Sequence, residues 1–255
     1  MGVSGHYGLD GKVALVTGGT RGLGRLIAQA LAAQGCHVAV CSRTAAAGPL
    51  PGIDAHVLDI RDVDQAQALV AAVVAHHGGI DILINNAGGS PGVPAKSTSP
   101  RLVDALLKLN LAAPFTLAQA AYPHMVKRGG GSIVNIASVS GARPSPGTAI
   151  YGAAKAGLMN LTQSLAQEWG RDGIRVNAIV AGLMATETAE HTYGDAEAQA
   201  AVGRSMPLGR MGTGDDLAGA VCWLCSDDAG WVSGARLQVD GGGERPYFLE
   251  LVKGS

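Results

Sequence analysis

The sequence predicts an α/β fold in which a parallel sheet is covered by helices on both faces. Short apolar stretches rich in Val, Ile and Leu alternate with longer stretches of helical spacing along the chain. Strands joined through helices form right-handed βαβ units, and continuously apolar strands indicate burial on both faces. The chain contains no linker-like segment and no internal repeat, so residues 1–255 are predicted to form a single domain.

The order of the predicted elements follows from this alternation. Strands are predicted at residues 12–18, 36–42, 53–60, 80–88, 131–138, 174–182 and 235–242. Helices are predicted at residues 25–35, 62–78, 99–129, 150–170 and 214–226, with Pro114 at a bend. The connection at 44–52 is short, so its helix is expected to be lost or reduced. Residues 183–210 are polar and mixed, and we expect a lid insertion with short helices there.

Composition gives no support for several classes of partner. The formal net charge is −1, and no long run of Lys and Arg supports binding to nucleic acid or to an anionic membrane. No apolar run approaches the roughly 20 residues that span a bilayer. The N-terminus shows no apolar core of a secretory signal, so a cytoplasmic enzyme is expected.

The cysteines and histidines give no prediction of a metal site. Cys222 and Cys225 form a single CxxC inside a predicted helix. One such pair is weak evidence for zinc, and a redox pair is expected at a helix N-terminus, so we interpret both as core residues. His76 and His77 end a predicted helix, where a cation suits the helix dipole, and they are interpreted as structural.

A glycine-rich turn follows the first predicted strand. The segment TGGTRGLG at 17–24 places Gly18, Gly22 and Gly24 between a strand and a helix. Glycines allow a tight turn whose main-chain N–H groups reach a pyrophosphate, and the helix N-terminus favours the same charge. The sequence therefore predicts a dinucleotide site, because the turn lies in the required context.

The end of the second strand indicates which dinucleotide binds. An NAD site usually has an acidic residue there, whereas this strand ends in Ser42 and Arg43, with Arg21 in the glycine turn. An arginine attracts a 2′-phosphate, so NADP(H) is favoured over NAD(H). The alternative is that Arg43 is a solvated surface charge. Asp59, after the third strand, is predicted either to contact adenine or to start the next helix.

A tyrosine and a lysine lie four residues apart at the start of a predicted helix. Tyr151 and Lys155 therefore share one helix face, and Ser138 ends the preceding strand at the sheet edge where ligands bind. A free tyrosine has a pKa of about 10, and a nearby cation lowers it. We therefore predict that Lys155 lowers the pKa of Tyr151, and that Ser138 holds a substrate oxygen while Tyr151 transfers the proton.

These motifs together resemble the classical short-chain dehydrogenase/reductase family, of the 3-oxoacyl-reductase-like kind, over nearly the whole chain. The resemblance rests on TGGTRGLG (17–24), NNAG (85–88), Asn110, Ser138 and YGAAK (151–155). It implies a Rossmann fold with the catalytic residues Asn110, Ser138, Tyr151 and Lys155. Lys155 is expected to hold the nicotinamide ribose, and Asn110 to kink its helix and support a proton relay. Cofactor contacts are expected from Gly18, Thr20, Arg21, Gly22, Leu23, Ser42, Arg43, Asp59, Ile60, Asn86, Ala87, Gly88, Tyr151, Lys155, Gly182 and Thr186.

The sequence departs from the family pattern after the sixth strand. Ala181 stands where the family has proline, while Gly182 and Thr186 are kept, so the backbone loses a rigid φ beside the nicotinamide. Substrate contacts are expected from Ser138, Tyr151, Met184 and Tyr193, with Thr188 as a further wall residue. The lid suits a ketone or secondary alcohol of medium size and does not separate carrier-bound, steroid, sugar and polyketide substrates.

Alternatives remain at the level of function. The leading hypothesis is an NADP(H)-dependent oxidoreductase acting on a ketone or secondary alcohol, without a metal. An NAD-dependent secondary-alcohol dehydrogenase is the runner-up, and a non-catalytic dinucleotide sensor would not need Ser138, Tyr151 and Lys155. A basic patch for an acidic carrier would consist of Arg101, Lys108, Lys127 and Arg128, unless these are solvated helix faces. The resemblance also implies a homotetramer or homodimer, onto which the apolar tail at 244–255 is expected to pack.

Overall fold

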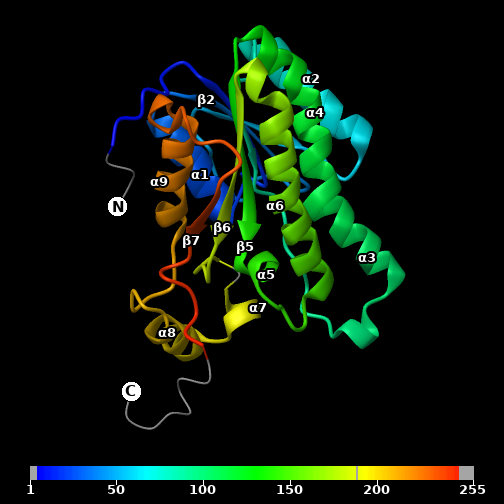
Figure 1. The fold of residues 1–255 in the computed structure, drawn as a ribbon, viewed down its shortest axis with the longest axis vertical. Coiled ribbons are helices and arrows are strands. Elements are labelled where there is room, and N and C mark those ends of the chain that lie inside the picture. The colour runs from blue at the N-terminus through cyan, green and yellow to red at the C-terminus, as the bar shows by residue number, and fades with distance from the viewer. Residues whose placement is uncertain (1–4, 188, 247–255) are drawn as a thin grey trace.

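The computed structural model describes residues 5–187 and 189–246, which form a seven-stranded parallel sheet in the order β3-β2-β1-β4-β5-β6-β7 (Figure 1). Thr188 and most of the apolar tail lie outside the described residues. The strands are β1 Val13–Thr17, β2 His37–Ser42, β3 Ile53–Val57, β4 Ile82–Asn85, β5 Gly131–Ser138, β6 Ile174–Ala181 and β7 Arg236–Val239. The predicted fold class and strand number are confirmed, and the strands other than β5 are shorter than predicted.

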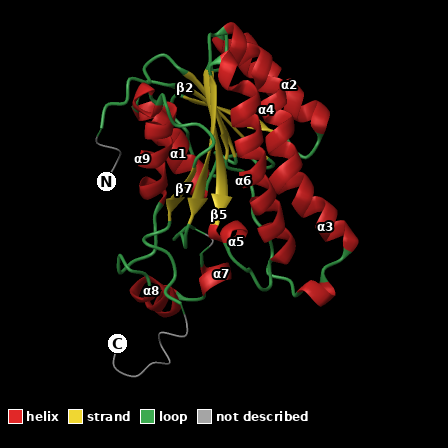
Figure 2. Ribbon diagram, in the orientation of Figure 1, coloured by secondary structure: helices red, strands yellow, loops and turns green. Residues whose placement is uncertain are grey.

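Helices cover both faces of the sheet (Figure 2). The helices are α1 Gly22–Ala33, α2 Val63–His77, α3 Pro100–Leu107, α4 Ala113–Lys127, α5 Val139–Ala142, α6 Ala149–Trp169, α7 Glu190–Tyr193, α8 Ala196–Ser205 and α9 Gly214–Cys225. Helices α1 and α9 bury one core with Val16, Val40 and Ile84, while α2, α4 and α6 bury the other with Leu15, Leu83 and Ile133. Burial on both sides explains why the central strands are continuously apolar.

The helix predicted at 99–129 is interrupted by a π-helical turn at Lys108–Ala112. The distortion surrounds Asn110, where the family resemblance implies a kink, and Pro114 follows it in the first turn of α4. Pro114 has no N–H, so the carbonyl of Asn110 cannot receive the usual bond from four residues ahead. The side chain of Asn110 instead donates to the Leu106 carbonyl at 3.0 Å. Turns of this kind often lie at functional sites.

Two further expectations concern the connections. No helix forms between β2 and β3, as the short 44–52 segment predicts. Residues 183–210 contain the short helices α7 and α8, which lie beyond the carboxyl ends of β5, β6 and β7 (Figure 1). Within the described residues, none of the helices is long and apolar enough to cross a membrane.

Candidate active site

Ser138 and Tyr151 meet where β5 ends and α6 begins. Ser138 is the last residue of β5, and its hydroxyl accepts a hydrogen bond from the Ser140 N–H at 3.2 Å at the start of α5. Tyr151 lies in the first turn of α6, and its hydroxyl is hydrogen-bonded to the Ser138 side chain. The predicted pair is therefore brought together at the carboxyl edge of the sheet.

Lys155 lies one helical turn after Tyr151 and is almost completely buried. Its exposed fraction is 3%, its Nζ donates to the Ile136 carbonyl at 2.7 Å, and Nζ lies 5.7 Å from the centroid of the Tyr151 ring. Burial lowers the pKa of Lys155 to about 8, because desolvation disfavours the ammonium. The predicted shared face of Tyr151 and Lys155 is present.

The predicted direction of the Tyr151 pKa is wrong for this structure. Burial raises the pKa of the Tyr151 phenol, and the hydrogen bond with Ser138 offsets only part of that effect. The Tyr193 phenol, which lies nearby, raises the pKa further. Spacing along a helix indicates that a cation is close, but the loss of solvent is a property of the packed structure and is the largest cause of this shift.

Asn110 holds the loop that follows β4, and this loop passes beside Lys155. Its side chain is fully buried, accepts from the Gly89 N–H at 3.0 Å and donates to the Gly89 carbonyl at 3.2 Å. A Cβ on Gly88 would lie 2.7 Å from Oδ1 of Asn110 and 3.2 Å from Nζ of Lys155. Only glycine therefore fits at position 88. We call Asn110, Ser138, Tyr151 and Lys155 the proton-transfer corner.

The glycine turn has the properties of a dinucleotide cradle. A Cβ on Gly24 would lie 2.3 Å from the Gly18 carbonyl oxygen and 2.4 Å from Nδ2 of Asn86. Glycine thus allows α1 to begin directly against the turn. The first turn of α1 carries no acidic residue, and its N-cap residue Arg21 makes no side-chain capping bond. The N–H groups and positive end of α1 therefore suit a pyrophosphate, and this chain fits a nicotinamide dinucleotide.

The loop after β4 is fastened to β1 by Thr17, a residue that the sequence reasoning missed. The Thr17 hydroxyl accepts from the N–H groups of Asn86 and Ala87, both at 3.0 Å. Nδ2 of Asn86 donates to the Thr17 carbonyl at 2.9 Å. These bonds hold Asn86 and Ala87 beside the glycine turn. A threonine that ends a buried strand is the one local signal that could have indicated this role.

The end of β2 carries hydroxyl groups and a cation. Thr20 is buried and donates to the Ser42 hydroxyl at 2.9 Å, and Ser42 in turn donates to the Thr44 carbonyl. Arg43 and Arg21 are exposed. The side chains of Leu23 and Ile60 complete the predicted set, with Ile60 6% exposed and Leu23 packed against the core.

Asp59 is neutralised by a neighbour that the sequence analysis did not single out. Arg61 donates to both carboxylate oxygens of Asp59, with Nε at 2.9 and 3.0 Å. This hydrogen-bonded pairing holds the pKa of Asp59 below its usual value, and the charge of Arg43 acts in the same direction. The sequence signal for this ion pair was the presence of two opposite charges, two residues apart, directly after a strand.

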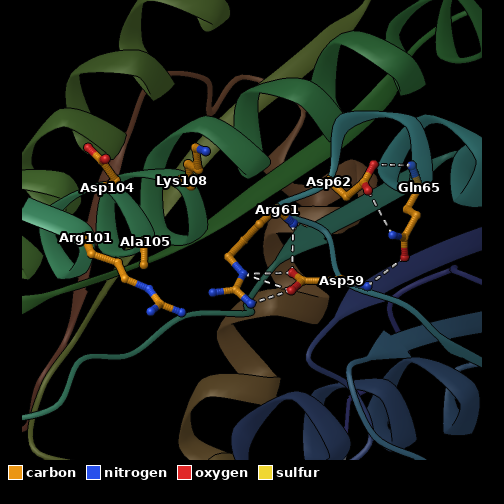
Figure 3. Close-up of a pocket in the computed structure, with 8 residues that line it drawn as sticks. All are labelled: Asp59, Arg61, Asp62, Gln65, Arg101, Asp104, Ala105 and Lys108. Carbon is orange, nitrogen blue, oxygen red and sulfur yellow. Dashed lines mark hydrogen bonds and ion pairs between the residues drawn. The ribbon is translucent and has the colours of Figure 1, made fainter.

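A hollow of about 740 Å³ lies beside Asp59 (Figure 3). Figure 3 shows Arg61 and Asp59 on one side of it, and Arg101 of α3 and Lys108 of the π-helical turn on the other. Of the expected basic patch, Arg101 and Lys108 line this hollow, whereas Arg128 is held by Asp81 through bonds of 2.9 and 3.1 Å. Arg128 therefore belongs to a structural ion pair.

The residues predicted after β6 divide between the core and the site. Gly182 donates to the Val239 carbonyl at 3.0 Å, and Thr186 is partly buried. Met184 is 6% exposed in the apolar core, and a Cβ on Gly212 would lie 2.6 Å from its sulfur. The Tyr193 phenol is hydrogen-bonded to the Met184 backbone and lies close enough to affect Tyr151, so it faces the proton-transfer corner.

Comparison with known proteins gives relatives over nearly the full chain. Residues 18–244 match the family described as Enoyl-(Acyl carrier protein) reductase. The chain is 38% identical to gluconate 5-dehydrogenase of Gluconobacter oxydans, covering 92% of this chain and 96% of the relative. It is 37% identical to 3-oxoacyl-(acyl-carrier-protein) reductase FabG of Haemophilus influenzae, covering 92% and 98%.

A solved structure supports the same assignment. Aldohexose dehydrogenase of Thermoplasma acidophilum superposes with a TM-score of 0.88 at 28% identity, and 98% of each chain is covered. Relatives that share this fold and length are dehydrogenases and reductases acting on alcohol or keto groups. The chain is therefore an oxidoreductase that belongs to the short-chain dehydrogenase/reductase family.

Proposed function

We propose that the chain is an NADP(H)-dependent oxidoreductase that interconverts a ketone and a secondary alcohol, with Tyr151 as the general acid and base. The observation that carries the proposal is the hydrogen bond between Ser138 and Tyr151 with Lys155 buried one turn away. A dinucleotide sensor would need the glycine turn but not this corner. The proposed site lies where open α/β folds bind their ligands.

Each residue of the corner has a separate role in the proposed mechanism. Ser138 and Tyr151 hold the substrate oxygen between their hydroxyl groups, and Tyr151 passes its proton to that oxygen or takes it away. The bound nicotinamide supplies or accepts the hydride. Lys155 holds the cofactor ribose, while Asn110 fixes the Gly88–Gly89 loop that passes beside Lys155.

The NADP(H) preference is supported by the charges around β2. The strand ends in Ser42 rather than a carboxylate, Arg43 and Arg21 are exposed, and the nearby carboxylate of Asp59 is paired with Arg61. A 2′-phosphate would meet two cations and no free carboxylate from these residues.

The test is a side-by-side fluorescence titration with NADPH and NADH, followed by assays with each cofactor. Medium-sized ketones are assayed for reduction, and sugar alcohols and hydroxy acids for oxidation. Tighter binding of NADPH together with turnover of a ketone supports the proposal. Tight binding without turnover of any member of the panel would support the sensor instead.

An NAD-dependent secondary-alcohol dehydrogenase is the second candidate. The names of two relatives, gluconate 5-dehydrogenase and aldohexose dehydrogenase, favour a polyhydroxylated substrate in the oxidative direction. Tighter binding of NADH, with turnover confined to sugar-like alcohols, would select this candidate. The FabG relative favours a ketone in the reductive direction, so the same panel separates the two.

We also infer a homotetramer or homodimer, and a cytoplasmic location stays a prediction. Large apolar side chains are exposed on the outer helices, among them Leu107, Phe115 and Val126, and Trp231 is fully exposed. Exposed apolar side chains of this size favour contact with a second copy. Sizing with light scattering at micromolar concentration tests this, and a monomer would contradict it.

A further inference from the structure

Two histidines and a carboxylate converge at the sheet edge opposite the proton-transfer corner. Asp54 is the second residue of β3, and His76 and His77 end α2, which runs back across the sheet. The nitrogen and oxygen atoms of the three side chains all lie within 4.8 Å of one another. Among the described residues, no other group of three such side chains meets in this way. Sequence spacing gave no indication of it, because Asp54 and His76 meet only through packing.

The ring of His77 has one buried nitrogen that contacts Asp54 without making a hydrogen bond. Its Nε2 is buried and makes no hydrogen bond, although it lies 2.8 Å from Oδ2 of Asp54. The ring also stacks against His37 of β2, with 5.7 Å between centroids. A buried polar atom without a hydrogen-bond partner calls for an explanation, and an ion is one of the known explanations.

The separations between the three side chains are compatible with a bound transition-metal ion. Metal bonds of about 2.0–2.2 Å in a tetrahedral arrangement separate neighbouring ligand atoms by roughly 3.3 Å. Oδ2 of Asp54 lies 2.8 Å from Nε2 of His77 and 3.6 Å from Nε2 of His76, so the separations bracket that value. The negative end of the α2 dipole adds a favourable charge for a cation.

We propose that Asp54, His76 and His77 form a binding site for a divalent transition-metal ion such as Zn²⁺. Two imidazoles and one carboxylate suit zinc, copper or nickel, whereas magnesium prefers a shell of oxygen atoms. The side chain of His76 is 71% exposed and that of Asp54 is 46% exposed, so the ion has a path from solvent. Water completes the coordination.

The ion would join an edge strand to a helix. β3 is the outermost strand of the sheet on this side and pairs only with β2 among the described strands. A metal held by Asp54 of β3 and the C-terminus of α2 would fasten that edge. The role is therefore structural, because Ser138 and Tyr151 lie at the opposite, carboxyl edge of the sheet.

The test is a titration of the full-length, tag-free chain with Zn²⁺ after removal of metals with a chelator. A competing chromophoric chelator reports affinity and stoichiometry. We expect one Zn²⁺ per chain, a higher Tm with Zn²⁺, and no effect of Mg²⁺ at equal concentration. His76→Ala and Asp54→Ala should each weaken binding of Zn²⁺ by more than about tenfold. Changes to residues that only hydrogen-bond to a metal ligand already have effects of that size.

His56→Ala is the matched control. His56 lies on β3 two residues after Asp54 and faces the same side of the sheet, but it is not one of the three ligands. His56→Ala should bind Zn²⁺ with wild-type affinity. Because the His76 side chain is exposed, His76→Ala should keep the fold. Wild-type affinity in His76→Ala and Asp54→Ala would overturn the proposal. So would a sulfur ligand in the zinc X-ray absorption spectrum, which would move the ion to a cysteine.

Discussion

The proton-transfer corner and the glycine turn lie at the same edge of the sheet and are built from different parts of the chain. The corner depends on side chains that are hydrogen-bonded to one another, as with Ser138 and Tyr151. The turn depends on main-chain groups, and Gly24 has no room for even a methyl group. The chemistry of the corner is therefore separable from the fold, whereas the turn cannot be changed without moving the backbone.

Tyr151→Phe should produce the largest effect and tests whether the corner is separable. The change removes only the hydroxyl that transfers the proton, so kcat should fall by about 10³-fold or more, while the Kd for NADPH changes by less than about threefold. Steady-state assays and fluorescence titration measure the two quantities.

Tyr122→Phe serves as the control, because the Tyr122 hydroxyl donates to Asp172 at 2.9 Å away from the corner. It should leave kcat unchanged. Turnover by Tyr151→Phe close to that of the control would remove Tyr151 from the mechanism.

Gly24→Ala should have the next largest effect and tests the turn. The added Cβ would meet the Gly18 carbonyl at 2.3 Å, and this backbone atom cannot move without displacing the start of α1. We expect a loss of about 2–3 kcal/mol in the free energy of unfolding, together with weaker binding of both cofactors. Urea denaturation and cofactor titration measure these changes.

Gly219→Ala is the comparison within the neighbouring helix α9. Nothing lies within 4 Å of a Cβ at Gly219, so alanine should stabilise the helix by about 0.5–1 kcal/mol. If the two variants behave alike, close packing at Gly24 is not what requires glycine there.

Burial of the Lys155 ammonium lowers the stability of the folded chain. Its pKa is lowered to about 8 in the folded chain and returns to about 10.5 on unfolding. Between these values the unfolded chain binds more protons, so stability rises with pH. Below about pH 8 the full penalty of the buried ammonium is present.

Relative to Lys155→Met, the wild type should therefore gain on the order of 2 kcal/mol between pH 7 and pH 9.5. Urea denaturation of both proteins at the two pH values gives this difference, and titrations elsewhere in the chain cancel in the comparison. A difference that is constant with pH would mean that Lys155 keeps an ordinary pKa in the folded chain.

The sequence predicts the sheet well because its inner strands contain local apolar runs, such as Val13 to Val16 in β1. The corner is predictable for a similar reason, since Tyr151 and Lys155 are one helical turn apart and Ser138 ends a strand. The features that the sequence did not predict depend on packing. The pKa of Tyr151 rises through burial, and Met184 enters the core beside Gly212.

Contacts between distant segments were missed for the same physical reason. Thr17 fastens Asn86 and Ala87 across 69 and 70 positions, and no local pattern connects them. Asp59 and Arg61 are close in sequence, but their pairing decides whether a free carboxylate remains beside Arg43. That pairing is visible only when the side chains are placed.

Arg43→Ala should have the smallest effect. It sharpens the comparison between the corner and the turn, because Arg43 is a side chain beside a cofactor site that is otherwise built from main-chain groups. If Arg43 binds the 2′-phosphate, its loss should weaken NADPH about tenfold, the size of one charge-assisted hydrogen bond, and leave NADH unchanged. Raising the salt concentration should reduce the difference, since the side chain is exposed.

Arg25→Ala is the control. It removes the same charge from α1, where Nη2 donates to the Pro49 carbonyl at 3.0 Å, and should leave the ratio of the two affinities unaltered. Equal weakening of both cofactors by Arg43→Ala would show that the preference for one dinucleotide, like the binding of the pyrophosphate, comes from the main chain.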